Sequence, residues 1–275
     1  MNTENAEWGA ELARMRAAVP LVHNITNYVA MNFMANALLA AGCAPAMVHA
    51  PEEAGEFAAQ ADALTINLGT LSLPWIEGML QAVAAARAAG RPWALDPVAV
   101  GATRLRRDTA ARLLALRPTA FRGNASEIVA LAGWDGARGR GVDAGAPVTT
   151  AEPAARALAR QTGATVAVTG AVDFVTDGQR AARIANGHAR MPQVTALGCA
   201  LTGVIGAFLA TSPSAWTGTV AALAYYGLAG ERAAAASAGP GSFAVAFLDA
   251  LAALDAAAVT AGARVQQLAP SDASG

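Results

Sequence analysis

The feature that most constrains the fold is the alternation of short apolar segments with longer, Ala-rich segments of helical character. Short segments with the composition of buried strands lie at 20–23, 44–48, 63–68, 92–95, 119–121 and 165–169. Segments of helical character lie at 7–17, 73–89, 108–116, 125–132 and 152–161, and another ends at 41. We expect Thr26 or Asn27 to cap this last helix and Gly42 to end it. The order predicts an α/β fold with a mostly parallel central sheet and helices on both faces.

The second half of the chain predicts a hairpin followed by helices. Residues 172–176 and 180–184 have strand character, and Asp177-Gly178 between them is a strong turn signal. Three Ala-rich helices are expected to start at Cys199, near Ser214 and near Ser242. The Gly-rich segment 133–147 is interpreted as a functional loop, and the tail from about residue 269 as frayed. We expect residues 1–275 to form a single domain.

The charge content restricts the partners and predicts an oligomer. Only 14% of the 275 residues are charged, against about 25% in an average globular domain. Either part of the surface is buried between subunits, or the exposed faces are covered by Ala and Gly; we favour the oligomer, because a small Ala-rich surface alone would not explain so few charges. A net charge of −1 gives no footprint for nucleic acid or an anionic membrane. Residues 1–16 lack the apolar core of a signal peptide, and no uninterrupted apolar run reaches membrane-spanning length, so a cytoplasmic protein is expected.

The reactive residue types exclude several chemistries. The two cysteines, Cys43 and Cys199, are far apart and predict neither a disulfide framework nor a metal knuckle. All 19 basic residues are arginines, which excludes a Walker A lysine and a pyridoxal-phosphate Schiff base. Any phosphate must therefore be held by backbone amides, arginine or metal. A nucleotide-dependent dehydrogenase is not expected, because no G-x-G-x-x-G opens a helix after an early strand.

Chemically useful residues follow the ends of the predicted strands, where open α/β sheets bind ligands. Asp96 ends one strand, Arg122 another and Thr169 a third, while Glu127 lies in the first turn of a helix. Gly198 stands at the start of a long apolar helix, whose first turn offers free amides and the positive end of its dipole. This helix end is an expected anion site for a transferring phosphoryl group.

The same residues fit phosphoryl transfer as a set, although each has a simpler structural reading. Asp96 and Glu127 are oxygen ligands of the kind Mg²⁺ takes beside substrate phosphates, and Arg122 with Thr169 could hold the phosphates. Alternatively, Glu127 could complete a capping box with the cap three residues before it, and Asp96 could shape a turn before proline. Cys199 alone could be a small buried hydrophobe. Their common position at strand ends favours the functional reading.

Several motifs together resemble the hydroxyethylthiazole kinase family. They are LVHNITN at 21–27, NLGTL at 67–71, LDPV at 95–98, RGNASE at 122–127, GVDAG at 141–145, NGH at 186–188 and GPGSF at 239–243. The match runs in order from about residue 19 to about residue 254. The resemblance implies a ribokinase-like fold and phosphorylation of 4-methyl-5-(2-hydroxyethyl)thiazole by ATP and Mg²⁺ in thiamine salvage. It also implies a homotrimer with substrate sites at the subunit interfaces.

The resemblance assigns expected roles to individual residues. Met47 resembles the methionine that contacts the thiazole, with Asn27 near that pocket, while Arg122 and Thr169 resemble ATP-binding residues. Cys199 stands where related sugar and vitamin kinases carry a catalytic aspartate, and its helix N-terminus is expected to lower the thiol pKa.

By the same resemblance, Asp96 and Glu127 correspond to the carboxylates on the magnesium side. Ala196 replaces a glycine that the family uses near substrate; an alanine can offer its amide there unless a positive φ is needed. Ala171 stands where relatives often carry an acidic residue.

Other readings stay open at the level of sequence. Another ribokinase-like activity, on pyridoxal or hydroxymethylpyrimidine, or a dehydratase of hydrated nicotinamide nucleotides, would share most of these residues. Cysteine at position 199 favours the thiazole branch. A non-catalytic thiazole or nucleotide sensor is disfavoured because Asp96, Arg122 and Glu127 are all present.

Overall fold

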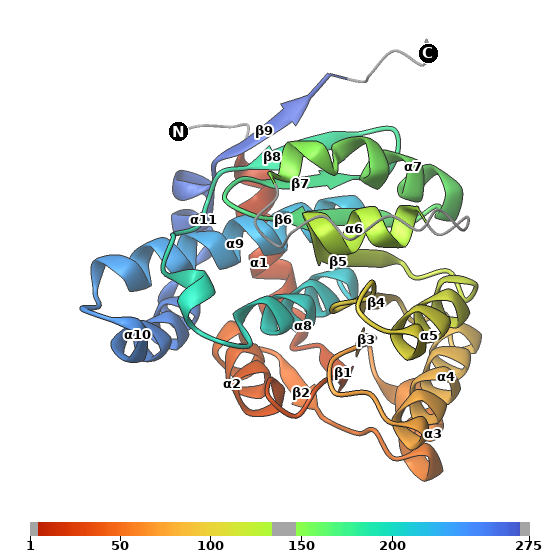
Figure 1. Ribbon diagram of the computed structural model, residues 1–275. Coiled ribbons are helices and arrows are strands. Elements are labelled where there is room, and N and C mark those ends of the chain that lie inside the picture. Colours follow the sequence, from red (N-terminus) through yellow and green to blue (C-terminus); the bar gives the residue numbers. More distant parts are fainter. Residues whose placement is uncertain (1–4, 134–146, 270–275) are drawn as a thin grey trace.

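A nine-stranded sheet organises the part of the chain that the computed structural model describes, residues 5–133 and 147–269 (Figure 1). The strand order is β2-β1-β3-β4-β5-β6-β7-β8-β9, with parallel pairing from β2 to β6 and antiparallel pairing from β6 to β9. The strands are β1 Leu21–Ile25, β2 Ala44–Ala46, β3 Ala63–Asn67, β4 Trp93–Asp96, β5 Ala120–Asn124, β6 Thr165–Thr169, β7 Asp173–Thr176, β8 Ala181–Ile184 and β9 Val265–Leu268. The predicted mostly parallel α/β sheet is confirmed.

Helices cover both faces of this sheet, as expected. One cluster of buried apolar side chains joins the sheet to α1 Ala6–Ala18, α2 Met31–Ala41, α8 Leu197–Leu209, α9 Ala215–Ala235, α10 Pro240–Ala253 and α11 Ala256–Gly262. The other joins it to α3 Pro51–Gln60, α4 Leu73–Ala88, α5 Arg104–Leu114, α6 Ala125–Ala132 and α7 Glu152–Thr162. Two short 3₁₀ segments, Val148–Thr150 and Met191–Gln193, complete the described elements. Neighbouring residues of β4 show the alternation, because Ala94 packs in the first cluster while Trp93 and Leu95 pack in the second.

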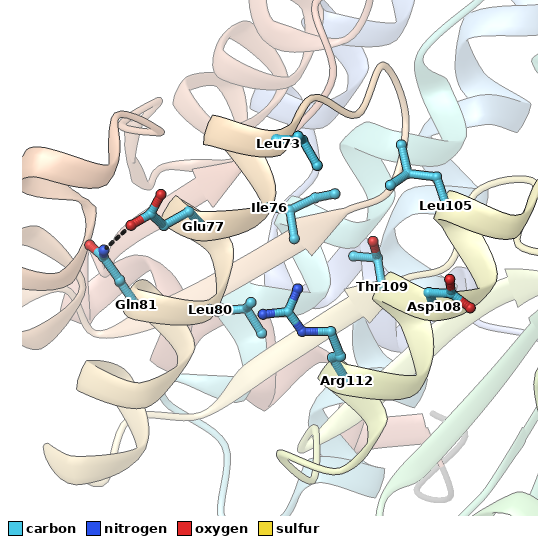
Figure 2. Close-up of a pocket in the computed structure, with 9 residues that line it drawn as sticks. All are labelled: Leu73, Ile76, Glu77, Leu80, Gln81, Leu105, Asp108, Thr109 and Arg112. Atoms are coloured by element: carbon cyan, nitrogen blue, oxygen red, sulfur yellow. Dashed lines mark hydrogen bonds between the residues drawn. The ribbon is translucent and has the colours of Figure 1, made fainter.

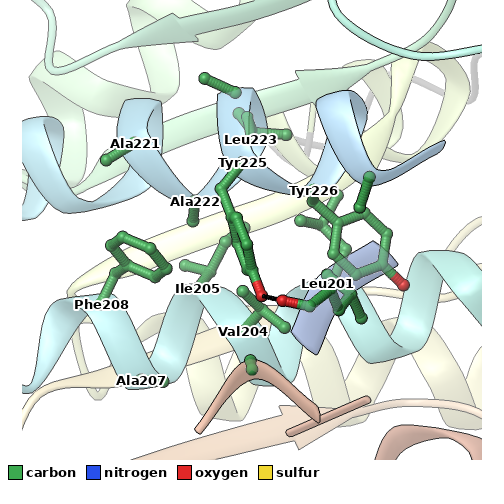
Figure 3. Packing of buried hydrophobic residues seen from close by; sticks show 14 of the residues in the cluster. Leu201, Val204, Ile205, Ala207, Phe208, Ala221, Ala222, Leu223, Tyr225 and Tyr226 are labelled. Atoms are coloured by element: carbon green, nitrogen blue, oxygen red, sulfur yellow. Dashed lines mark hydrogen bonds between the residues drawn. The ribbon is translucent and has the colours of Figure 1, made fainter. Parts of the chain in front are cut away.

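The helix α8, whose first turn is the expected anion site, packs against α9 (Figure 3). Val204, Ile205 and Phe208 of α8 are fully buried, and burial of such a side chain contributes roughly 1.5–3 kcal/mol. The Tyr226 hydroxyl, on α9, donates to the Leu197 carbonyl oxygen at 2.8 Å in the first turn of α8. Burial holds the pKa of Tyr226 well above its usual value, so the hydroxyl stays a donor. The start of α8 is therefore anchored from its apolar side.

Several predicted boundaries are wrong, and each has a local cause. The helix α2 starts at Met31 because residues 27–30 form a turn, in which the Ala30 and Met31 amides donate to the Asn27 carbonyl. The helix α5 starts at Arg104, earlier than predicted, because the Thr103 side chain accepts from the Arg106 amide. The helix α8 starts at Leu197 rather than at Cys199, and α10 starts at Pro240 rather than near Ser242. The helices α3 and α11 and the strand β9 were not predicted.

The remaining expectations concern the loop, the tail and the membrane. Most of the Gly-rich segment, residues 134–146, and the tail, residues 270–275, lie outside the described residues. Within the described ranges, no single helix is both long and apolar enough to cross a membrane. Only α10 and α11 taken together reach that length, and they are bent by 110° to each other.

Candidate active site

The candidate residues gather at the carboxyl edge of the parallel strands. Asn27 follows β1, Asn67 ends β3, Asp96 ends β4, Arg122 lies in β5 and Thr169 ends β6. Because β1, β3, β4, β5 and β6 are consecutive parallel neighbours, their carboxyl ends meet along one edge. The structure therefore brings together Asp96, Arg122 and Thr169, which the sequence predicted at strand ends.

Asp96 is fully buried, and one of its carboxylate oxygens has no hydrogen-bond partner in the part of the chain that the structure describes. Its Oδ2 accepts from Asn67 Nδ2 at 2.9 Å and from the Thr202 hydroxyl at 3.0 Å, and lies 3.6 Å from Arg122 Nη1. Its Oδ1 is buried and has no hydrogen-bond partner among the described residues. Burial and the nearby Glu127 charge raise the pKa of Asp96 to about 7, against the opposing effects of Arg122, Thr202 and Asn67. A buried, unpaired carboxylate oxygen fits a position that binds a cation.

Glu127 forms the capping box that was its alternative reading. Its Oε2 accepts from the Asn124 amide at 2.9 Å, while the Asn124 side chain accepts from the Glu127 amide at 2.9 Å. Its Oε1 accepts from the Ala99 amide at 3.0 Å. Each carboxylate oxygen still has a further lone pair, so the box orients Glu127 without excluding a metal role.

Arg122 connects three parts of the site. Its Nη2 donates to Thr169 Oγ1 at 2.7 Å, its Nη1 faces Asp96, and its Nε is buried without a partner among the described residues. A Cβ built at Gly198 would lie 2.8 Å from Arg122 Nη1, so glycine allows the guanidinium to lie against the first turn of α8. Burial opposes the charge, but the carboxylates of Asp96 and Glu127 hold the pKa of Arg122 above its ordinary value. A fixed cation thus lies beside the positive end of a helix, which suits a polyanionic ligand.

Ala196 takes the conformation in which the sequence predicted strain. It is the N-cap of α8 with φ 69° and ψ −9°, the left-handed region that favours glycine. Its carbonyl oxygen still accepts from the Ala200 amide at 2.8 Å. The turn before α8 therefore keeps its geometry at a cost of roughly 1–2 kcal/mol for a residue with a Cβ.

Cys199 is half-buried in the first turn of α8 and receives a hydrogen bond. Asn27 Nδ2 lies 3.3 Å from Cys199 Sγ, and the same Nδ2 donates to Asn67 Oδ1 at 2.9 Å. The expectation of a lowered thiol pKa is wrong. Burial and then the Asp96 charge raise the pKa of Cys199, and outweigh the opposing effects of Asn27, Arg122 and Asn67.

A cavity of about 1000 Å³ lies on the Arg122 side of the site. Arg122, Thr169, Ala196 and Gly198 line it, together with residues of the β6–β7 turn and of the segment that precedes α8. Asn27, Met47 and Cys199 do not line it. Met47 follows β2, is half-buried and packs against the apolar cluster of α2 and α8.

A smaller cavity of about 510 Å³ lies between α4 and α5 (Figure 2). Leu73, Ile76 and Leu80 of α4 and Leu105, Thr109 and Arg112 of α5 are among its lining residues. None of the candidate site residues lines this cavity.

Four residues of the site were given no role from the sequence. Asn67 and Thr202 hold Asp96, and Tyr226 anchors α8. Asp173 is buried beside the cavity, where its Oδ1 accepts from the Gly170 amide at 2.8 Å and burial raises its pKa to about 7. Asn67 is the penultimate residue of the strand predicted at 63–68, so the strand-end rule could have found it; the others require the three-dimensional structure.

The metal-binding capacity of the site is limited to two carboxylates. Among the described residues there is no group of three or more His, Cys, Asp or Glu side chains that could hold a metal ion by itself. The Glu127 charge nevertheless contributes to the raised pKa of Asp96, and Mg²⁺ commonly binds through one or two carboxylates together with substrate phosphates. The donor set fits that kind of metal.

A parallel sheet whose carboxyl edge carries two carboxylates, a buried arginine and a helix N-terminus defines the chain as a small-molecule kinase of the α/β class. The sequence model described as "Hydroxyethylthiazole kinase family" matches residues 12–257. The chain is 63% identical over 258 residues to a hydroxyethylthiazole kinase of Cereibacter sphaeroides, covering 94% of this chain and 98% of that protein. It is 64% identical over 258 residues to one of Rhizobium johnstonii, covering 94% and 96%. The chain belongs to the hydroxyethylthiazole kinase family.

Solved structures agree with this assignment and with the expected ribokinase-like fold. A hydroxyethylthiazole kinase protein from Pyrococcus horikoshii superimposes with a TM-score of 0.88 at 39% identity, covering 95% of this chain and 99% of that chain. A pyridoxal kinase from Staphylococcus aureus superimposes with a TM-score of 0.58 at 17% identity, covering 78% and 88%. At that identity the second likeness concerns the fold alone.

Proposed function

We propose that this protein transfers the terminal phosphoryl group of ATP to the hydroxyl of 4-methyl-5-(2-hydroxyethyl)thiazole, in a Mg²⁺-dependent reaction of thiamine salvage. The observation that carries the proposal is the convergence of Asp96, Arg122 and the start of α8 at one sheet edge in a member of this family. The identity of 63–64% over 94% of the chain supports the thiazole as acceptor.

The nucleotide is assigned to the larger cavity. Its volume of about 1000 Å³ is at the upper end of the range for small-molecule and cofactor sites. Arg122 and Thr169 reach into it from β5 and β6 and are linked by a 2.7 Å hydrogen bond. Arg122 binds phosphate oxygens through charge-assisted hydrogen bonds, and the Thr169 hydroxyl adds a neutral donor.

Asp96 and Glu127 are assigned to the metal. The unpaired Asp96 Oδ1 supplies a buried oxygen, and the capping box holds the Glu127 carboxylate in a fixed orientation. Bound Mg²⁺ would neutralise charge that develops on the phosphate oxygens. Before it binds, the proton that the raised pKa of Asp96 retains near neutral pH must leave the carboxyl group.

Cys199 and the amides of α8 are assigned to the transferring group. The transition state is loose, so positioning and charge stabilisation dominate, and the proton of the attacking hydroxyl leaves late. Only the thiolate of Cys199 can accept that proton, and because burial raises the pKa of Cys199 the thiolate is the minor form near neutral pH, which fits an assisting base rather than an indispensable one. Met47 and Asn27 are assigned to the thiazole side and Ala196 to the backbone contact with substrate.

A homotrimer is proposed to complete the thiazole side. Tyr28 and Val29 directly follow Asn27 and are 67% and 61% exposed, so they form an exposed apolar pair beside it. Together with the low charged fraction of 14%, they support burial against a second copy of the chain. Light scattering should report three copies per particle, and a stable, fully active monomer would remove this proposal.

A coupled ADP-release assay tests the activity. Purified protein is mixed with ATP and Mg²⁺ and with hydroxyethylthiazole, pyridoxal or hydroxymethylpyrimidine in parallel. We expect the thiazole to accelerate ADP release most, and EDTA to abolish that acceleration. If ADP appears no faster with the thiazole than without an acceptor, while another alcohol accelerates it, the thiazole assignment is wrong.

A further inference from the structure

A continuous chain of side-chain hydrogen bonds joins the thiol of Cys199 to the carboxylate of Asp96. Asn27 Nδ2 donates to Cys199 Sγ at 3.3 Å and to Asn67 Oδ1 at 2.9 Å. Asn67 Nδ2 in turn donates to Asp96 Oδ2 at 2.9 Å. The three links span residues that follow or end β1, β3 and β4 and reach the first turn of α8.

The orientation of the Asn67 amide is determined by a partner that cannot reverse its role. The Gly69 backbone amide only donates, so its 2.9 Å bond requires Asn67 Oδ1, and this turns the NH₂ group of Asn67 toward Asp96 Oδ2, which accepts from it at 2.9 Å. Asn67 Oδ1 then takes its second hydrogen bond from Asn27 Nδ2. Rotating the Asn67 amide by 180° would oppose donor to donor at two of these contacts.

The orientation of Asn27 follows from that of Asn67. The Ala30 amide donates to Asn27 Oδ1 at 3.0 Å, which places the NH₂ group of Asn27 toward Asn67 and Cys199. Asn27 and Asn67 are 6% and 2% exposed. A Cβ at Gly69 would lie 2.6 Å from the Asn27 Cβ, so the backbone of Gly69 packs directly against this side chain. The N–H that faces the sulfur is therefore held by packing as well as by hydrogen bonds.

We propose that Asn67 is a positioning residue for phosphoryl transfer, which acts through Asn27 to hold a hydrogen-bond donor on Cys199 and directly to orient the Asp96 carboxylate. The proposal rests on the proposed function for the roles of Cys199 and Asp96. Because Asn67 is only 2% exposed, no contact with substrate is assigned to it. It sets the relative position of the group that accepts the hydroxyl proton and the group that faces the metal.

Thiol alkylation gives a readout that does not depend on the substrate. The chain has two cysteines, and burial raises the pKa of Cys43 to about 12, so iodoacetamide at a fixed, near-neutral pH should label Cys199 selectively. Loss of the donor on the sulfur removes stabilisation of the thiolate, the reactive form. We expect Asn67→Ala to slow Cys199 labelling about tenfold, the effect of losing one hydrogen bond to a charged group.

A double-mutant cycle distinguishes positioning from general loosening. Asn67→Ala should slow labelling in the wild type but cause no further slowing in the Asn27→Ala background, because the donor is already absent. In steady-state kinetics, the single variant Asn67→Ala should lower kcat about tenfold or more. It should leave KM for ATP within about twofold, since Arg122 and Thr169 are intact. Thr65→Val is the matched control. Thr65 lies on the same strand as Asn67 and is equally buried. Its hydroxyl donates to Asn24 Oδ1 at 2.7 Å, a bond that does not belong to the series linking Cys199 to Asp96.

Three results would overturn the proposal. The first is equal slowing of labelling in both backgrounds, and the second is a kcat within twofold of wild type. The third is faster labelling of both Cys43 and Cys199, which would indicate loosening. If Asn67→Ala does not fold, Asn67→Ser, which is too short to bridge the same partners, carries the same expectations. If the thiazole is not the substrate, the ADP-release assay fails while the labelling cycle still gives its result.

Discussion

Replacing Ala196 by glycine should stabilise the protein, which is the reverse of the usual effect of this change. Ala196 has φ 69° at the N-cap of α8, and this conformation costs a residue with a Cβ roughly 1–2 kcal/mol. Glycine removes that cost, but its greater conformational freedom in the unfolded chain lowers stability by about 0.4–1 kcal/mol. The difference predicts a net stabilisation of about 0.8 kcal/mol, within a range of ~0–1.6 kcal/mol.

The assay is urea unfolding at one fixed protein concentration, with Ala84→Gly as the matched control. Ala84 is exposed within α4 and is not among the residues with positive φ, so glycine there should destabilise the protein by about 0.5–1 kcal/mol. Both variants should keep the wild-type m-value. If Ala196→Gly destabilises as much as Ala84→Gly, the account of strain at the start of α8 is refuted.

Three further predictions concern binding, chemistry and pH. Arg122→Ala should weaken ATP binding by roughly 1.5–3 kcal/mol, and Thr169→Ala by less because it removes a neutral hydroxyl; unchanged affinity by calorimetry would place the nucleotide elsewhere. Cys199→Ala should lose about 10–1000-fold in turnover, at or below the general-base range, and Cys199→Asp should stay active; an inactive aspartate variant that binds both ligands normally would contradict the assisting role. Burial raises the pKa of Asp173 to about 7, so its contribution to stability is lost as pH rises from about 4 to 7. Asp173→Asn can still accept from the Gly170 amide, so its free energy of unfolding should gain at least about 1.4 kcal/mol relative to wild type between those pH values. Free energies of unfolding from urea titrations that change equally with pH in the two proteins would contradict this.

Much of the fold could be predicted because the signals are local. The strand β6 and the helix α6 coincide with their predictions, and the Asp177-Gly178 turn joins β7 to β8 as expected. The strand β9, Val265–Leu268, escaped prediction because its sequence VQQL is half polar and it pairs only with β8. The helix α3 has only one large apolar side chain, Phe57, although Pro51 followed by Glu52 and Glu53 is a helix-start signal that could have been used.

The site could be located from the sequence more readily than its electrostatics. Strand ends identified Asp96, Arg122 and Thr169, because parallel strands bring such ends together without knowledge of the packing. The pKa of Cys199 could not be obtained in that way, since burial and the Asp96 charge, both properties of the folded chain, outweigh its hydrogen bond and the nearby guanidinium. The link from Asn27 to Asn67 joins residues 40 positions apart, and only the pairing of β1 with β3 brings them together.

The most direct test of the central claim is to identify the phosphorylated product. The protein is incubated with ATP, Mg²⁺ and hydroxyethylthiazole, and mass spectrometry measures the thiazole species while ADP is quantified in the same sample. We predict a thiazole monophosphate that accumulates in a one-to-one ratio with ADP, and neither product in an Asp96→Asn variant. ADP formed without phosphorylated thiazole, or no ADP at all from folded protein, would contradict the account.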